Sequence, residues 1–422
     1  MKEDFLHYLW VHKKLPFTQL KTHQNETLEI IHFGNYLQLS GPDIFNAQIR
    51  ISNQKWAGNI EIHVKSSDWY LHHHENNKAY DSIILHVVWE YDVPVFRKDN
   101  SEIPTLELKN WVTQKELTSY KNLMLKKSWI NCEGEIHTVD SFYWENWKEK
   151  LVLERLERKA IAISERLEAT KNDWEQVFFE LVAKNFGLHT NGALFLKMAQ
   201  QLSFQIVRKE KTNLLHLEAL FFGLVNALDA THEDNYFKEL HQAWYYLKTK
   251  YKLKEIIGAE LSFFKHRPDN FPTIRLAQLA MVLFTAENLF YDCMHTGSSE
   301  KLKKSFRQAT SLYWQTHYVF GTPSVTKQKV VTDSFLDLIF VNTIVPMQFC
   351  YQSKLHDMPL EQLLQGLKGV KEEKNAIIDK FKTLKIEVSN AYDSQALLQL
   401  KNEYCDKFKC LQCAVGLNIL KK

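Results

Sequence analysis

Apolar and polar positions alternate with a period of two along the first 110 residues, which is the spacing of β-strands. In the segment 60–65 (IEIHVK), one face is apolar and the opposite face carries Glu61, His63 and Lys65. The segment 82–89 (SIILHVVW) is nearly all apolar, which predicts a central strand buried on both faces. We therefore expect residues 20–110 to form one mixed sheet with this strand in its interior. The other elements predicted here are a helix at 3–12 and strands at 28–33, 47–51 and 106–108.

From about residue 151 the apolar period changes to 3.6, which is typical of amphipathic helices. No fixed-period repeat is visible, so the pattern does not indicate a solenoid. The segments with helical spacing are 151–167, 174–186, 193–206, 214–228, 237–247, 274–290, 302–318, 335–345 and 360–384. The change of period predicts an α+β N-terminal domain with a mixed sheet at residues 1–125, followed by an all-α C-terminal domain at residues 126–422.

Length and composition are those of a globular protein. A chain of 422 residues is long enough for two domains, and an aromatic content of 13% excludes a disordered chain. The formal net charge of +3 is nearly neutral for this length, so charge alone does not indicate a nucleic-acid-binding protein. Any basic surface would have to be local.

Targeting signals are not apparent. The first ten residues (MKEDFLHYLW) include acids and no long apolar run, so we expect no signal peptide. The best apolar run, 336–347, is interrupted by Asp337, Asn342 and Pro346, so we expect no membrane-spanning helix. Six cysteines are too few for a disulfide scaffold of this size, and we therefore expect a reducing, cytoplasmic setting.

Residues suited to metal chemistry gather in one part of the predicted sheet. Asp43 precedes one strand, and Glu61, His63 and Lys65 share a face of the next, where alternate side chains project about 6–7 Å apart. Two carboxylates so close repel one another unless a cation lies between them. We expect Asp43 and Glu61 to hold Mg²⁺ or Mn²⁺, with Lys65 or His63 facing a phosphodiester. The alternative is the solvated face of a half-exposed sheet.

Further histidines follow in the sequence. His72 and His74, in a triplet with His73, are candidates for additional ligands of the same ion, and a solvated turn is the alternative. His86 lies within the apolar strand, and we interpret it as a hydrogen-bonded core histidine.

Three cysteines near the C-terminus, Cys405, Cys410 and Cys413, have the spacing C-x4-C-x2-C. Thiolates at this spacing can share Zn²⁺ or an iron–sulfur cluster. A fourth ligand would have to come from elsewhere, and the candidates are Cys132, Cys293, Cys350 or a histidine. The alternative is packing, because Cys410, Cys413 and Leu417 would form one apolar stripe on a helix.

The N-terminal order of elements resembles the core of the PD-(D/E)XK nuclease superfamily: a helix, a strand, a strand after Pro-Asp, a strand with an acid, a helix and a strand. The resemblance implies a restriction-endonuclease-like fold, with Asp43 and Glu61 in the positions that bind metal. His63 stands where that superfamily usually has the Lys that assists attack, and Lys65 is the nearest substitute on the same face.

Nearly the whole chain is similar to an uncharacterised bacterial family, domain-of-unknown-function family 2851. The blocks that carry this similarity are GPDIFNAQI, GNIEIHVKSSDW, ILHVVWEYD, RPDNFPTIRLAQLA and KCLQCAVG. The combined expectation is a metal-dependent nuclease, or a nuclease-derived DNA-processing protein, that binds nucleic acid. The alternatives are a non-catalytic scaffold for nucleic acid or protein that retains the fold, and a hydrolase of another class with a metal in the His-rich loop.

Overall fold

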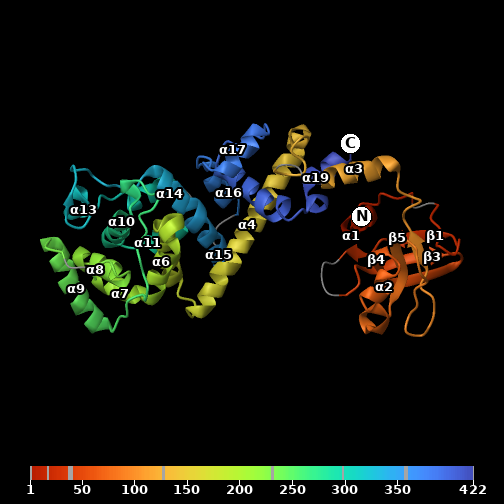
Figure 1. Cartoon of the computed structure of the whole chain (residues 1–422), viewed down its shortest axis with the longest axis horizontal. Coiled ribbons are helices and arrows are strands. Elements are labelled where there is room, and N and C mark those ends of the chain that lie inside the picture. The colour runs from red at the N-terminus through yellow and green to blue at the C-terminus, as the bar shows by residue number, and fades with distance from the viewer. Residues whose placement is uncertain are drawn as a thin grey trace. The chain divides into compact units, whose positions relative to one another are not determined.

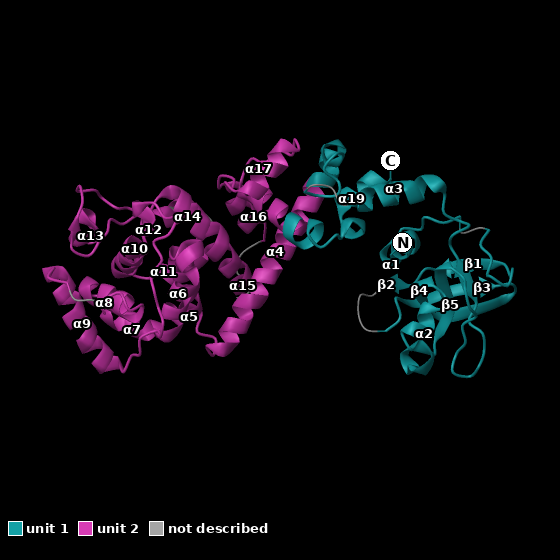
Figure 2. Ribbon diagram, in the orientation of Figure 1, with its two compact units in different colours: residues 1–144, 401–422 teal, residues 145–400 magenta. Residues whose placement is uncertain are grey.

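The computed structural model describes most of the chain, and it divides into two compact units that are coloured separately in Figure 2. Unit 1 comprises Met1–Trp144 with Lys401–Lys422, and unit 2 comprises Glu145–Leu400. The C-terminal residues thus belong with the N-terminal sheet, and the predicted domain boundary after residue 125 stays a prediction. The described ranges are 2–16, 19–36, 41–125, 129–229, 232–296, 299–355 and 360–421.

Unit 1 is built on a mixed sheet, which has six strands within the described residues (Figure 1). The strands are β1 (Leu28–His32), β2 (Asn35–Tyr36), β3 (Ile44–Ile51), β4 (Gln54–Lys65), β5 (Ile83–Glu90) and β6 (Thr105–Glu107). Their order is β1-β3-β4-β5-β6, with β2 also paired to β3. The pairs β1/β3 and β3/β4 are antiparallel, whereas β4/β5 and β5/β6 are parallel. The expectation of one mixed sheet with the 82–89 segment in its interior is confirmed, since β5 lies between β4 and β6.

The parallel step from β4 to β5 requires a crossover, because two parallel strands cannot be joined by a hairpin. It consists of α2 (Asp68–Leu71) and the 3-10 turns η1 (His74–Asn76) and η2 (Lys78–Tyr80). Trp69 and Tyr80 of this crossover pack with Ile83 in a small apolar cluster. The crossover therefore covers the sheet close to the polar side chains of β4.

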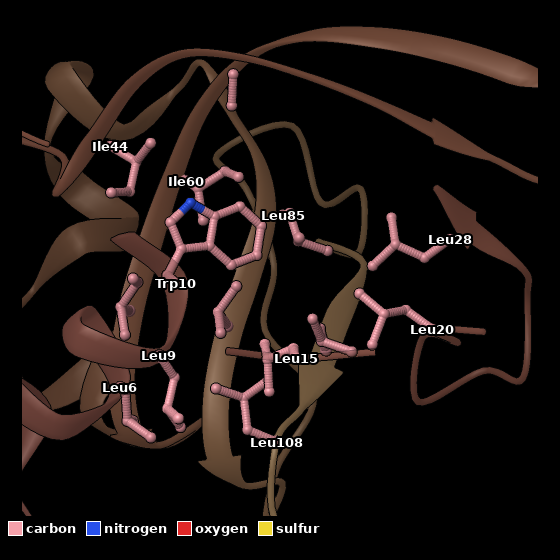
Figure 3. Packing of buried hydrophobic residues seen from close by; sticks show 14 of the residues in the cluster. Leu6, Leu9, Trp10, Leu15, Leu20, Leu28, Ile44, Ile60, Leu85 and Leu108 are labelled. Atoms are coloured by element: carbon pink, nitrogen blue, oxygen red, sulfur yellow. The ribbon is translucent and has the colours of Figure 1, made fainter. Parts of the chain in front are cut away.

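A larger core fills the other face of the sheet, beneath α1 (Glu3–Val11). Leu9 and Trp10 of this helix are almost fully buried and pack together with Ile44 and Ile60 of the sheet (Figure 3). Because β4 alternates, its isoleucines enter this core and its polar residues point to the opposite face. The other helical elements of unit 1 are α3 (Gln114–Met124), η3 (Ile136–Thr138), η6 (Leu400–Cys405), η7 (Cys410–Gln412) and α19 (Ala414–Leu420).

Unit 2 is helical apart from one short hairpin, β7 (His317–Val319) and β8 (Thr322–Pro323), within the described residues. The division between the units falls inside α4 (Ser141–Ala169). The prediction of a largely helical region after the sheet is confirmed. Its helices are α5 (Trp174–Phe186), α6 (Leu188–Gln201), α7 (Phe204–Glu210), α8 (Leu214–Leu224), α9 (Asn235–Tyr251), η4 (Pro268–Asn270), α10 (Pro272–Thr285), α11 (Leu289–His295), α12 (Ser299–Phe306), α13 (Leu312–Thr316), α14 (Asp333–Ile339), η5 (Phe340–Ile344), α15 (Val345–Leu355), α16 (Leu360–Lys368), α17 (Ala376–Thr383) and α18 (Ala391–Gln399).

One helical stretch in unit 2, Asp333–Lys354, is 22 residues long and has a mean hydropathy of 1.3. By length and composition alone it could cross a membrane, although 67% of its most apolar window is buried. Such burial is also what the core helix of a globular unit shows. The expectation that no helix spans a membrane therefore stays a prediction.

Candidate functional site

Asp43 and Glu61, the two predicted acidic ligands, lie side by side on neighbouring strands. Asp43 directly precedes β3, and the register pairs Ile44 with Ile60, so that Asp43 comes next to Glu61 of β4. The backbone N–H of Asp43 donates to Glu61 Oε2 at 3.2 Å, and the N–H of Ile62 donates to Asp43 Oδ2 at 3.0 Å. Each carboxylate is thus held by the backbone of the opposite strand.

Three histidines converge beside this pair. His63 lies on β4, His72 follows α2, and His74 begins η1. One ring nitrogen from each lies within 4.8 Å of the others, and His63 Nε2 is 3.1 Å from His72 Nδ1. Between the last two, His73 adopts a left-handed backbone with φ of 58°, which reverses the chain within the triplet. This turn lets both of its neighbours approach the same histidine of the sheet.

Glu61 joins the acidic pair to the histidines. Its Oε1 atom lies 3.4 Å from His74 Nε2 and 3.6 Å from His63 Nε2. Glu61 and His63 are only 5% and 1% exposed, so these groups meet in a poorly hydrated place. Three imidazole nitrogens, two of them close to a carboxylate oxygen of Glu61, are donors that suit a divalent transition metal.

Burial strongly shifts the pKa values of Glu61 and His63. Burial, followed by the negative charge of Asp43, raises the pKa of Glu61 to about 9. Burial, followed by the neighbouring histidines, lowers the pKa of His63 to about 2. In the metal-free protein at neutral pH, Glu61 is therefore protonated and His63 is neutral. A divalent cation would reverse the preference of Glu61, because it favours the carboxylate, and it would find His63 already in the form that binds metal.

Several buried nitrogens at this site have no hydrogen-bond partner among the described residues: Nδ1 and Nε2 of His74 and Nδ1 of His86. Buried polar groups are normally satisfied, since an unpaired one costs about 1–3 kcal/mol. A bound ion would satisfy Nε2 of His74, which faces Glu61.

Two residues of the site were missed or only partly understood from the sequence. His7 of α1 places Nε2 3.2 Å from Asp43 Oδ2, and Tyr36 Oη lies 3.3 Å from its Nδ1. His86 is buried and its Nε2 lies 2.8 Å from His63 Nδ1, so it orients that ring as a hydrogen-bonded core histidine. No signal in the sequence connects His7 with a residue 36 positions away, because the two meet only when α1 packs on the sheet.

Lys65, by contrast, lies at the exposed end of β4. Its backbone N–H donates to Asp68 Oδ2 at 2.8 Å, and its charge helps to lower the pKa of Asp92, which Ser67 and Ser66 also lower by hydrogen bonding. Among the described residues, no contact joins its ammonium group to Asp43 or Glu61. The three C-terminal cysteines lie in unit 1.

Fold and site together define an α+β protein whose sheet and crossover bring together a partly buried cluster of carboxylates and imidazoles. The chain belongs to the family described as protein of unknown function (DUF2851), whose model matches residues 3–376. The family expected from the sequence blocks is thereby confirmed. Comparison with the curated proteins and with the solved structures found no match.

Proposed function

We propose that this protein is a divalent-metal-dependent nuclease that hydrolyses phosphodiesters of nucleic acid, with a restriction-endonuclease-like N-terminal domain. The order of elements supports the proposal: α1, β1, β3 after Pro42-Asp43, β4 with Glu61, α2 and β5 follow one another as in the PD-(D/E)XK core. The observation that carries it is the meeting of three imidazoles, two of which lie close to Glu61, beside Asp43.

The donor set bears on the identity of the ion. Mg²⁺ binds oxygen ligands and keeps several waters, whereas imidazole nitrogens suit Mn²⁺, Zn²⁺ and their neighbours. Of the two ions expected from the sequence, the arrangement favours Mn²⁺. Glu61, His63, His72 and His74 would hold it, with Asp43 next to them. The ion would activate a water molecule and stabilise negative charge on the phosphate.

We assign the cationic group that would contact the phosphate from the positions of three candidate side chains, His63, Lys65 and His7. His63, in the place of the usual lysine, is buried and neutral, and Lys65 lies at the exposed end of its strand. His7 Nε2 lies 3.2 Å from Asp43 Oδ2, directly beside the acidic pair, and the His7 side chain is 17% exposed. We assign to His7 the charge that neutralises the phosphate in the transition state.

Cleavage and ion binding test the proposal together. Single-stranded, double-stranded and branched nucleic acids are incubated at low salt with Mn²⁺, Mg²⁺ or Zn²⁺, because weak phosphate contacts are screened at high salt. Asp43→Asn and Glu61→Gln should abolish cleavage and keep the fold. Glu29→Gln, an acid-to-amide change at an exposed position of the same sheet, is the matched control and should keep full activity.

Titration calorimetry of the ions distinguishes the alternatives. If wild-type protein binds Mn²⁺ at this site but cleaves no substrate, the hydrolytic role is refuted. If it neither binds an ion nor cleaves, the non-catalytic scaffold that retains the fold takes its place.

A further inference from the structure

The cysteines near the C-terminus lie on a succession of tight turns in unit 1. Cys405 ends the π-helical turn η6, Cys410 begins η7, and Cys413 directly precedes α19. Cys413 donates its backbone N–H to the carbonyl of Cys410 at 3.3 Å. The helix begins only at Ala414, so the interpretation of Cys410 and Cys413 as part of one helical stripe is wrong.

The turn at Cys410 is closely held by α19. A Cβ atom at Gly416 would lie 2.1 Å from the carbonyl oxygen of Cys410, so only glycine fits at that position. The backbone that presents Cys410 is therefore set in place by the first turn of the helix.

A distant segment of the chain contacts these turns at two points. Asn131 Nδ2 donates to Cys410 Sγ at 3.5 Å, across 279 positions of sequence. The ammonium group of Lys401 lies 5.4 Å from the ring centroid of Trp129. Cys132 follows Asn131, and its carbonyl accepts hydrogen bonds from Glu135 and Ile136 in a turn of its own. The segment that carries a fourth thiol, Cys132, is thus brought to the turns that carry the other three.

The electrostatic influence of the thiols on one another accords with the contact between Asn131 and Cys410. Burial raises the pKa of Cys132, and Cys413 and Cys410 raise it further. Burial likewise raises the pKa of Cys405, with further contributions from Cys413, Cys132 and Cys410.

We propose that Cys132, Cys405, Cys410 and Cys413 form a four-thiolate centre for a thiophilic metal, either Zn²⁺ or an iron–sulfur cluster. Of the candidates for the fourth ligand, the structure selects Cys132. Cys293 and Cys350 belong to unit 2. The centre is separate from the proposed hydrolytic site and does not depend on it.

The position of the centre in the chain indicates its role. Residues 145–400 form unit 2, and the chain leaves unit 1 after Cys132 and returns to it before Cys405. A metal bound by both segments ties together the two passages of the chain through unit 1. Four protein ligands leave no open position on a Zn²⁺ ion, so the centre holds structure and does not bind substrate.

Metal content measured on the full-length protein, purified anaerobically, tests the centre. We expect about one equivalent of Zn²⁺ per chain, or iron and sulfide in equal amounts with a brown chromophore. X-ray absorption at the metal edge should show sulfur ligands, which distinguishes this metal from one bound by histidines. Wild-type protein with less than about a tenth of an equivalent of zinc and of iron, even after anaerobic reconstitution, would overturn the proposal.

Variants identify the ligands. Cys132→Ser should lower the metal content at least tenfold, whereas the matched control Cys350→Ser, in unit 2, should keep it. Full metal content in Cys132→Ser would exclude Cys132 as a ligand and refute the four-thiolate centre. If Cys132→Ser does not fold, Cys132→His provides the test, because a histidine can replace one thiolate on Zn²⁺. Its absorption spectrum should then show one nitrogen and three sulfur ligands, and four sulfur ligands would refute the assignment.

Discussion

Replacing Glu61 by glutamine in the metal-free protein should stabilise it, which is unusual for a buried residue in contact with several polar groups. The pKa of this carboxyl rises from 4.5 to about 9 on folding, through burial first and the charge of Asp43 second. At pH 7 the unfolded side chain is ionised, and folding requires it to take up a proton. This uptake costs about 3 kcal/mol, at roughly 1.36 kcal/mol per pH unit between 4.5 and 7.

The raised pKa of Glu61 also determines the direction in which the stability of the folded protein changes with pH. Between about pH 4.5 and 9 the folded state binds one more proton at Glu61 than the unfolded state does, so this contribution to stability falls as the pH rises. Glutamine cannot ionise and accepts the same hydrogen bond from the backbone of Asp43. The stability gap between Glu61→Gln and wild type should therefore grow from under about 1 kcal/mol at pH 5 to about 3 kcal/mol at pH 7.

Urea denaturation at both pH values, with EDTA present, measures this gap, and Glu29→Gln serves as the surface control. Saturating Mn²⁺ should reverse the order, since the ion stabilises wild type and Glu61→Gln lacks one of its ligands. A gap that does not change with pH would show that Glu61 is ionised in the folded, metal-free protein, and would refute this account of the site.

Three further predictions concern individual side chains. His74→Gln should weaken Mn²⁺ binding at least about tenfold by calorimetry, whereas His73→Asn should leave it unchanged, because asparagine tolerates the left-handed backbone there. His7→Gln should lower kcat for cleavage by about 100-fold and leave Mn²⁺ affinity intact, because it acts on the phosphate and not on the ion; an equal loss of affinity would contradict this role. Trp10→Ala should destabilise unit 1 by about 3–5 kcal/mol in urea, because it empties part of the core between α1 and the sheet.

The sheet and its acidic pair were predictable because both follow from local patterns. The apolar segment 82–89 has no polar face, so it had to lie inside a sheet, and β5 does. Asp43 directly precedes β3 and Glu61 lies within β4, and the antiparallel pairing of Ile44 with Ile60 places the two acids side by side. Lys65 was expected at the same site from its place in the alternation, but β4 ends there and the side chain is exposed.

Other parts of the two sites depend on contacts between distant residues. His7 reaches Asp43 only because α1 packs on one face of the sheet, and Asn131 reaches Cys410 only because the chain returns to unit 1 after residue 400. The order of residues along the chain does not show how closely the two members of either pair lie in the folded protein.

The sequence by itself determined that a sheet precedes a largely helical region, where the period changes, and which family the chain belongs to. These are properties of neighbouring residues, and hydrophobic burial forces each segment to turn its apolar positions inward. The tertiary structure alone decided which histidine stands beside Asp43, which cysteine lies in the same unit as the C-terminal three, and how poorly hydrated Glu61 is. Those properties arise from the packing of residues that are far apart in the chain. This packing removes water from around Glu61, and the loss of water raises the pKa of its carboxyl group.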